Sequence, residues 1–143
     1  MKKLMLILTS ILVILSGCDY ERSSEPGKII EVTYKEYEEM IKKDETFMVL
    51  ISQTNCSHCI AYKKDVLNVY LPTHGFTIYE LNVTNEEDPY GVFNTLKEEI
   101  GESFGGTPMT LVYKNKALEW SKAGVLSEDE LEDVVTKYRL DEK

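Results

Sequence analysis

Residues 47–59 read FMVLISQTNCSHC and carry the strongest structural signal of the chain. The first part, Phe47 to Ile51, is an unbroken apolar run of strand length, which is typical of a central strand with both faces buried. Two cysteines, Cys56 and Cys59, follow at once. Apolar residues then recur at helical spacing, at Tyr62, Val66, Val69 and Tyr70. Pro72 ends this predicted helix. The pattern predicts a cysteine pair at the junction between a buried strand and a helix.

This junction gives the two cysteines different chemistry. A sulfur at a helix N-terminus faces unpaired backbone N–H groups and the positive end of the helix dipole, which stabilise an anion. Such an environment lowers the pKa of a cysteine thiol from ~8.5 into the range ~3.5 to 7.5. We therefore expect Cys56 to be the nucleophilic thiolate and Cys59 to be the resolving thiol in thiol–disulfide exchange. As a structural staple, a loop this short would add little stability.

Other strands and helices alternate on both sides of the cysteine pair. Besides the strand at 47–51, the sequence predicts strands around 29–32, 76–83, 109–113 and 117–121, the last two joined by a turn at 114–116. Three further helices are predicted from their N-capping signals, which are Thr33 with Glu36, Asp88 with Pro89, and Ser127 with Glu130. The order is that of an α/β domain.

Length and charge limit the possible classes of protein. A chain of 143 residues has room for one hydrophobic core. Hydrophobic residues at 43% and charged residues at 29% argue against disorder and against a polytopic membrane protein. The 16 Lys and Arg against 25 Asp and Glu give a net charge of −9, which is the wrong sign for binding phosphates. Nucleic acid is therefore not an expected partner.

The N-terminus has the pattern of a targeting segment. Two lysines precede an apolar run, residues 4–15, that is too short for the ~20 residues of a spanning helix. The run ends in Leu15, Ser16, Gly17 and Cys18, which resembles the lipobox of bacterial lipoproteins. The resemblance implies a signal peptide at 1–17 and an acylated (palmitate-bearing) Cys18; a plain secretory signal is the alternative. Residues 18–27 are then read as a lipidated cysteine with a flexible tether, and residues 28–143 as the folded domain.

Acylation would also account for the odd number of cysteines. The chain has 3 cysteines, and an exported protein with one cysteine left over needs an intermolecular bond or a free thiol. With Cys18 acylated, Cys56 and Cys59 remain to react with each other.

From about Lys28 to Leu140 the chain resembles the thioredoxin family. The resemblance rests on the order of strands and helices, on the cysteine pair after the second strand, and on the run Gly105, Gly106, Thr107, Pro108 before Met109. It implies a thioredoxin fold, with a central mixed sheet of four to five strands and about four flanking helices. It also implies a cis peptide bond between Thr107 and Pro108 that faces the disulfide, and pairing of the Thr107 backbone with an extended substrate peptide.

Departures from the family pattern narrow the expected activity. Asn55 replaces the tryptophan before the first cysteine, and Leu50 replaces a buried aspartate that serves the resolving thiol. A different route must therefore carry the proton of Cys59. His58 is similar to the histidine of exported disulfide-forming oxidases, where the imidazole stabilises the thiolate and makes the disulfide more oxidising. The alternative is that His58 is a solvated residue at the helix start.

The sequence thus predicts a membrane-anchored, extracytoplasmic thiol–disulfide oxidoreductase, leaning toward oxidase. Its expected partners are exported cysteine-containing proteins or peptides and a membrane redox partner; it is expected to be a monomer without a cofactor. A narrower resemblance is to bacteriocin-accessory proteins of Gram-positive bacteria. A thioredoxin-fold docking module with an idle disulfide is one alternative. A metal-binding chaperone is another. Zinc sites usually have about four ligands, however, and His58 and His74 are the only histidines of the chain beside the cysteine pair.

Overall fold

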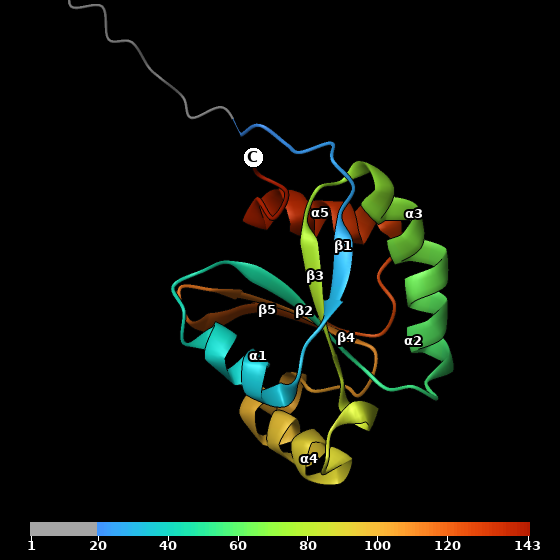
Figure 1. Cartoon of the computed structure of the whole chain (residues 1–143), viewed down its shortest axis with the longest axis vertical. Helices are drawn as coiled ribbons and strands as arrows, with labels where there is room; N and C mark the ends of the chain where they lie inside the picture. The colour runs from blue at the N-terminus through green and yellow to red at the C-terminus, as the bar shows by residue number, and fades with distance from the viewer. Residues whose placement is uncertain (1–19) are drawn as a thin grey trace, which may run out of the picture.

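A computed structural model describes residues 20–143 (Figure 1). The expected signal peptide and Cys18 lie outside the described residues. The core element is one five-stranded sheet in the order β1-β3-β2-β4-β5. Its strands are β1 (Lys28–Glu31), β2 (Phe47–Ser52), β3 (Thr77–Asn82), β4 (Met109–Lys114) and β5 (Ala117–Ala123).

The sheet is mixed, as expected. β1 and β2 both run parallel to β3, whereas β4 is antiparallel to β2 and to β5. All six residues of β2 are buried, which agrees with the unbroken apolar run. The structure therefore has the predicted α/β class and the predicted central strand.

Helices cover both faces of the sheet, and each face has its own core (Figure 1). On one face, α1 (Tyr34–Ile41) and α4 (Pro89–Ile100) pack on residues such as Val49 and Ile51. On the other face, α2 (Ser57–Tyr62), α3 (Asn68–Tyr70) and α5 (Glu128–Tyr138) pack on Met48 and Leu50. Alternation of side chains along β2 separates the two cores.

The predicted helix starts are confirmed by their caps. Thr33 with Glu36 and Ser127 with Glu130 form complete capping boxes. Asp88 caps α4 through a bond from the Gly91 N–H to its side chain. The β4–β5 turn is shorter than the predicted 114–116. It consists of two residues, Asn115 and Lys116, which both have positive φ.

The segment after the cysteine pair differs from the regular helix that the sequence predicted. Residues Lys63–Leu67 form a π-helical turn, in which the Asn68 N–H donates to the Lys63 carbonyl five residues earlier. A π turn accommodates one extra residue, so the buried face shifts along the sequence after it. Leu67 and Tyr70 are buried, whereas Val69, expected on the inner face, is 54% exposed.

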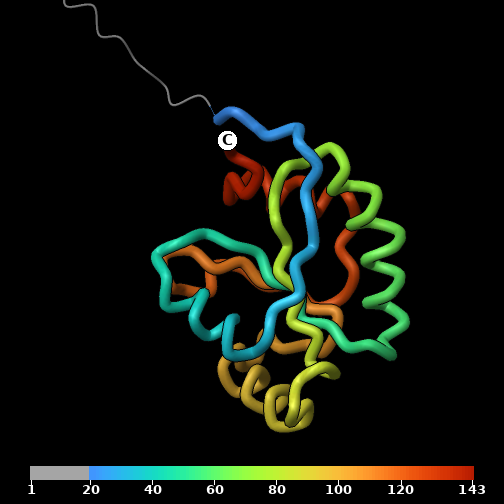
Figure 2. The backbone as a smooth tube through the Cα atoms, in the orientation of Figure 1, coloured from blue at the N-terminus to red at the C-terminus, as the bar shows by residue number. Residues whose placement is uncertain are grey.

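Residues 20–27, expected to be a flexible tether, are bonded to the domain from Tyr20 onward, where the Tyr20 hydroxyl donates to Asp141. We call this segment the N-terminal strap. The Ser23 N–H donates to the Asp141 carbonyl and the Gly27 N–H to the Leu71 carbonyl, and Arg22 pairs with the buried Asp141 at 2.8 Å. Figure 2 shows the strap passing beside the C-terminal end of the chain. The strap is polar because its side chains form ion pairs with the domain, and its backbone also bonds to the domain.

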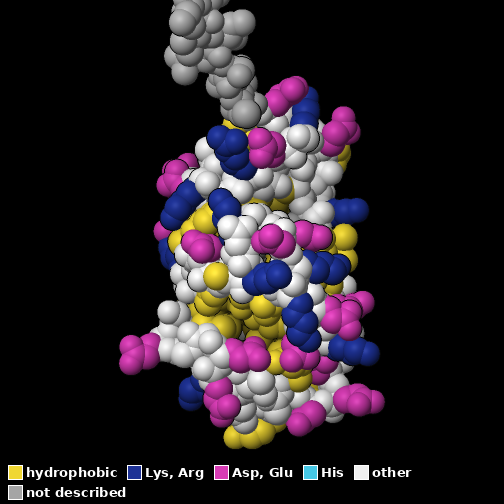
Figure 3. Space-filling model, turned by 90° about the vertical axis from the view of Figure 1, so that its left-hand side faces the viewer, with side chains coloured by type: hydrophobic (Ala, Val, Ile, Leu, Met, Phe, Trp, Pro, Cys, Tyr) yellow, Lys and Arg dark blue, Asp and Glu magenta, His cyan; other side chains and the backbone are white. Residues whose placement is uncertain are grey.

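None of the helices within residues 20–143 is long and apolar enough to cross a membrane. On the face shown in Figure 3, acidic and basic side chains are interspersed, and apolar side chains gather in a hollow between them.

Candidate active site at the Cys56–Cys59 pair

Cys56 lies where the sequence predicted, at the start of the helix that follows β2. It is the N-cap residue of α2, and its backbone is extended. The Cys59 N–H donates to the Cys56 sulfur at 3.1 Å, so Sγ occupies the position where a capping oxygen usually lies. The two cysteines are joined by a disulfide. In the reduced state, the same backbone donor would stabilise a thiolate at Cys56.

The two sulfurs differ in access. Cys56 is partly exposed, whereas Cys59, in the first turn of α2, is 0% exposed. Burial also raises the pKa of Tyr62, three residues after Cys59, to about 12, so its hydroxyl is neutral at ordinary pH. An incoming thiol can therefore reach Cys56 and not Cys59.

The loop before β4 closes the site from the opposite side. The Thr107–Pro108 peptide bond is cis, as expected. The Thr107 carbonyl oxygen lies 3.5 Å from the Cys56 sulfur; a disulfide sulfur has no hydrogen to donate, so this is a packing contact. Pro108 is buried, and its carbonyl accepts a bond from the Gly124 N–H at 2.8 Å.

Sequence reasoning missed Gln53, which joins these two loops. The Thr107 hydroxyl donates to Gln53 Oε1 at 3.0 Å. The Gln53 carbonyl accepts from the Cys56 N–H at 3.3 Å. Gln53 is an exposed loop residue between a strand and a helix, and nothing in the sequence distinguishes it from any other polar loop residue.

A buried carboxylate, Glu80, was also missed. It lies opposite Leu50 in the register of β2 and β3 and is 6% exposed. Its Oε1 accepts from Ser52 Oγ at 2.6 Å and from Lys63 Nζ at 2.7 Å. The backbone N–H of Lys63 donates to the Cys59 carbonyl. A carboxylate thus lies one strand away from Leu50, the position where the family pattern has its aspartate.

The sequence did contain a signal for Glu80. Alternation along 76–83 assigns Glu80 to the same face of β3 as Phe76 and Ile78. Both of those residues are in the core beneath α2 and α5. The alternation of two residues along this strand therefore indicated that the Glu80 carboxylate is buried.

His58 is exposed in the first turn of α2 and makes no hydrogen bond among residues 20–143 that the structure records. The residues described contain no group of three or more His, Cys, Asp or Glu side chains that could hold a metal ion. The structure brings Cys56, Cys59, Thr107 and Pro108 together, and among residues 20–143 it records no hydrogen bond from His58 to either sulfur.

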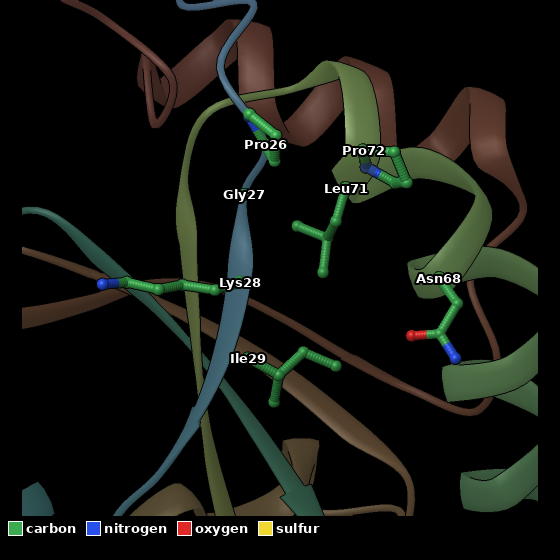
Figure 4. Close-up of a pocket in the computed structure, with 7 residues that line it drawn as sticks. All are labelled: Pro26, Gly27, Lys28, Ile29, Asn68, Leu71 and Pro72. Carbon is green, nitrogen blue, oxygen red and sulfur yellow. The ribbon is translucent and has the colours of Figure 1, made fainter.

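A separate shallow cavity of about 310 Å³ lies between β1 and the end of the α2–α3 segment (Figure 4). Its lining does not include the loops that carry Cys56 and Pro108; it consists of Pro26, Gly27, Lys28, Ile29, Asn68, Leu71 and Pro72. It is therefore distinct from the cysteine site.

No protein-family model matches the sequence, and no curated protein matches it. Solved structures do match. Thioredoxin f from spinach chloroplast is 19% identical with a TM-score of 0.57, and the match covers 82% of this chain and 98% of that one. A thioredoxin from Nicotiana alata is 19% identical with a TM-score of 0.55 over 82% and 98% of the two chains. The thioredoxin of Malassezia sympodialis is 14% identical with a TM-score of 0.55 over 79% and 93%. The described chain has the thioredoxin fold.

Proposed function

We propose that the protein is a thiol–disulfide oxidoreductase that works through Cys56 and Cys59. One observation carries the proposal: an accessible sulfur at the start of a helix is bonded to a sulfur with 0% exposure. A structural disulfide needs no such difference in access, whereas exchange needs one sulfur to be attacked and one to be released.

The asymmetry defines a reaction sequence for oxidation of a substrate dithiol. A substrate thiolate attacks Cys56 Sγ, the Cys56–Cys59 bond breaks, and Cys59 leaves as a thiolate that takes up a proton. The second substrate thiolate then attacks the substrate sulfur of the mixed disulfide and releases Cys56 as a thiolate. The substrate loses two electrons and the protein gains them, so a membrane redox partner must remove them. In the reverse direction, Cys59 resolves the mixed disulfide.

Thr107 is the substrate-binding residue in this proposal. Its carbonyl lies beside Cys56 Sγ, and an extended peptide that pairs with the Thr107 backbone would bring its cysteine to that sulfur. Backbone pairing gives affinity for many sequences, which suits a protein that acts on varied exported chains.

The direction of the reaction depends on His58. A positive or hydrogen-bonding imidazole near Cys56 would stabilise the reduced form and favour oxidation of substrates. His58→Pro should then lower the reduction potential and raise the pKa of Cys56 together. If neither changes, His58 is only a solvated residue and the oxidase assignment loses its support.

Membrane anchoring through Cys18 is part of the proposal. Two acyl chains in a bilayer give stable attachment at ~0.8 kcal/mol per buried CH₂, and the domain would then act outside the cytoplasm on exported cysteine-containing proteins, as in the bacteriocin-accessory proteins it resembles. Intact-mass analysis of the membrane fraction tests this. An unmodified Cys18 would contradict it.

Trapping tests the exchange chemistry. Cys59→Ser should accumulate mixed disulfides on Cys56, because the buried resolving sulfur is gone, and Cys56→Ser should accumulate none. If neither variant forms mixed disulfides, the alternative of a docking module with an idle disulfide is favoured. If Cys56→Ser is the trapping variant, the two roles are reversed.

A further inference from the structure

Two loops lie beside Cys56, and they come from distant parts of the chain. One loop follows β2 and carries Gln53 and Cys56; the other precedes β4 and carries Thr107. Within residues 20–143, the bond from Thr107 Oγ1 to Gln53 Oε1 at 3.0 Å is the side-chain hydrogen bond that the structure records between them. The remaining approach is the 3.5 Å packing contact of Cys56 Sγ with the Thr107 carbonyl.

Each loop has a separate attachment on its other side. The Cys56 loop is held by the Thr54 N–H, which donates to Thr84 Oγ1 at 3.0 Å. The Thr107 loop is held through the Pro108 carbonyl, which accepts from the Gly124 N–H at 2.8 Å. These bonds tie each loop to its own neighbour, and neither sets the distance between the loops. The loops leave the paired strands β2 and β4, whose register ends with Ile51 opposite Met109. Beyond that pair, the hydrogen bond between Gln53 and Thr107 is the side-chain link that holds the loops close.

Gln53 makes two bonds, one to each side of the site. Its side-chain carbonyl accepts from Thr107, and its main-chain carbonyl accepts from the Cys56 N–H at 3.3 Å. Together with the 3.5 Å contact between the Thr107 carbonyl and Cys56 Sγ, these bonds hold the Thr107 backbone beside the reactive sulfur. Because Gln53 is exposed, its replacement should change the free energy of unfolding little. We therefore expect its two bonds to affect the position of Thr107 more than the stability of the fold.

We propose that Gln53 is a positioning residue that holds the Thr107 backbone in register with Cys56 for extended peptide substrates. This rests on the proposed function. A peptide must pair with Thr107 and at the same time present its sulfur to Cys56. The binding of a peptide therefore depends on the distance between the loops. A small dithiol needs only access to Cys56 and does not depend on Thr107.

The test uses the full-length protein and two probes, a short synthetic peptide with two cysteines and dithiothreitol. Gln53→Leu removes the acceptor, and Thr107→Val removes the donor while keeping the branched shape. Each should raise KM for the peptide by roughly 3- to 10-fold, the effect of one lost hydrogen bond. For Gln53→Leu, the rate with dithiothreitol and kcat for the peptide should stay within about 2-fold of the wild-type values. The double variant should cost no more than either single change, because both remove the same bond.

Two further variants separate positioning from general damage. Thr107→Ser keeps the hydroxyl and should keep the wild-type KM. Thr95→Val is a matched control, because the Thr95 hydroxyl bonds to Gly91 within α4, and it should change nothing. An unchanged KM in Gln53→Leu, additive single effects, or an equal loss with dithiothreitol would each overturn the proposal. A wild-type protein that exchanges with neither probe would instead overturn the proposed function.

Discussion

Glu80 and its two donors are the least expected side chains of the site. Ser52 is 0% exposed and Glu80 6%, yet both are polar and lie beneath the helix that carries Cys59. Their cost of burial is offset because Ser52 and Lys63 both donate to Glu80 Oε1. The group behaves as one unit in which each member satisfies the others.

Replacing Glu80 tests that unit. Glu80→Ala leaves the buried Ser52 hydroxyl without an acceptor and Lys63 without its partner, so we expect a loss of about 3 kcal/mol in the free energy of unfolding. Glu80→Gln keeps an acceptor for Ser52 and should cost about 1–2 kcal/mol. Urea unfolding measures both. Glu98→Gln, on the exposed side of α4, is the control and should be neutral; equal values for all three variants would contradict the network.

The residues that carry chemistry were predictable to different degrees. Cys56, Cys59, Thr107 and Pro108 each belong to a short motif whose local structure is fixed, and the structure brings them together. Gln53 acts through a partner 54 positions away in the sequence, and no local pattern encodes such a pairing.

The π turn at Lys63–Leu67 is the element that sequence periodicity could not predict. A period of 3.6 residues predicts inward positions at Val66, Val69 and Tyr70. Tyr70 is buried and Val66 packs against the core, but Val69 is exposed and Leu67 is buried in its place, because the turn holds an extra residue. The caps of α1, α4 and α5 were predictable because each depends on residues within one turn.

Alanine substitutions at the last residue of the turn and just after the turn check which positions face the core. Leu67→Ala should lower the free energy of unfolding by about 2–4 kcal/mol, because Leu67 is 0% exposed. Val69→Ala should change it by less than about 0.5 kcal/mol, because that side chain is in water. Thermal or urea unfolding distinguishes them. A larger cost at Val69 would mean that the helix is regular.

The N-terminal strap is a second element with a measurable contribution. Arg22 bonds to Asp141, which is 0% exposed, and to Glu132. Arg22→Met leaves Asp141 without its cation and should cost about 2–4 kcal/mol. Lys143→Met, which breaks an exposed pair with Glu21, is the control and should cost less than about 1 kcal/mol. Equal costs for the two variants would mean that the strap contributes no more than a surface pair.

The strap also predicts a pH dependence. The hydrogen bond from Arg22 is the main cause that lowers the pKa of Glu132 from 4.5 to about 2. Because the folded-state pKa is depressed, this stabilisation is present above about pH 4.5 and is lost as the pH falls toward 2. The side chain of Glu132 is 39% exposed, so screening limits the effect to about 1 kcal/mol. Unfolding of Arg22→Met between these pH values should depend less steeply on pH than unfolding of the wild type; an identical slope would contradict the assignment.

In the whole molecule, the strap and the redox site lie at different ends. The strap meets the C-terminus and the far end of the α2–α3 segment, whereas Cys56 lies at the start of α2 (Figure 1). An anchor at Cys18, as proposed, would hold the domain by the end that lacks the site. The fold class followed from the order of short patterns, but the strap did not, because its ion pairs join residues more than 100 positions apart.

The reduction potential of the Cys56–Cys59 disulfide in the full-length protein, measured by equilibration with glutathione, decides whether this pair is catalytic or structural. Catalytic pairs lie between ~−270 mV, as in thioredoxin, and ~−120 mV, as in strong oxidants, whereas structural disulfides of secreted proteins lie below ~−300 mV. A helix-start sulfur in contact with the Cys59 N–H stabilises the reduced form, and ~30 mV corresponds to ~1.4 kcal/mol for a two-electron couple. We predict a value inside the catalytic range and nearer to its oxidising end. A value below ~−300 mV would make the disulfide structural and contradict the account.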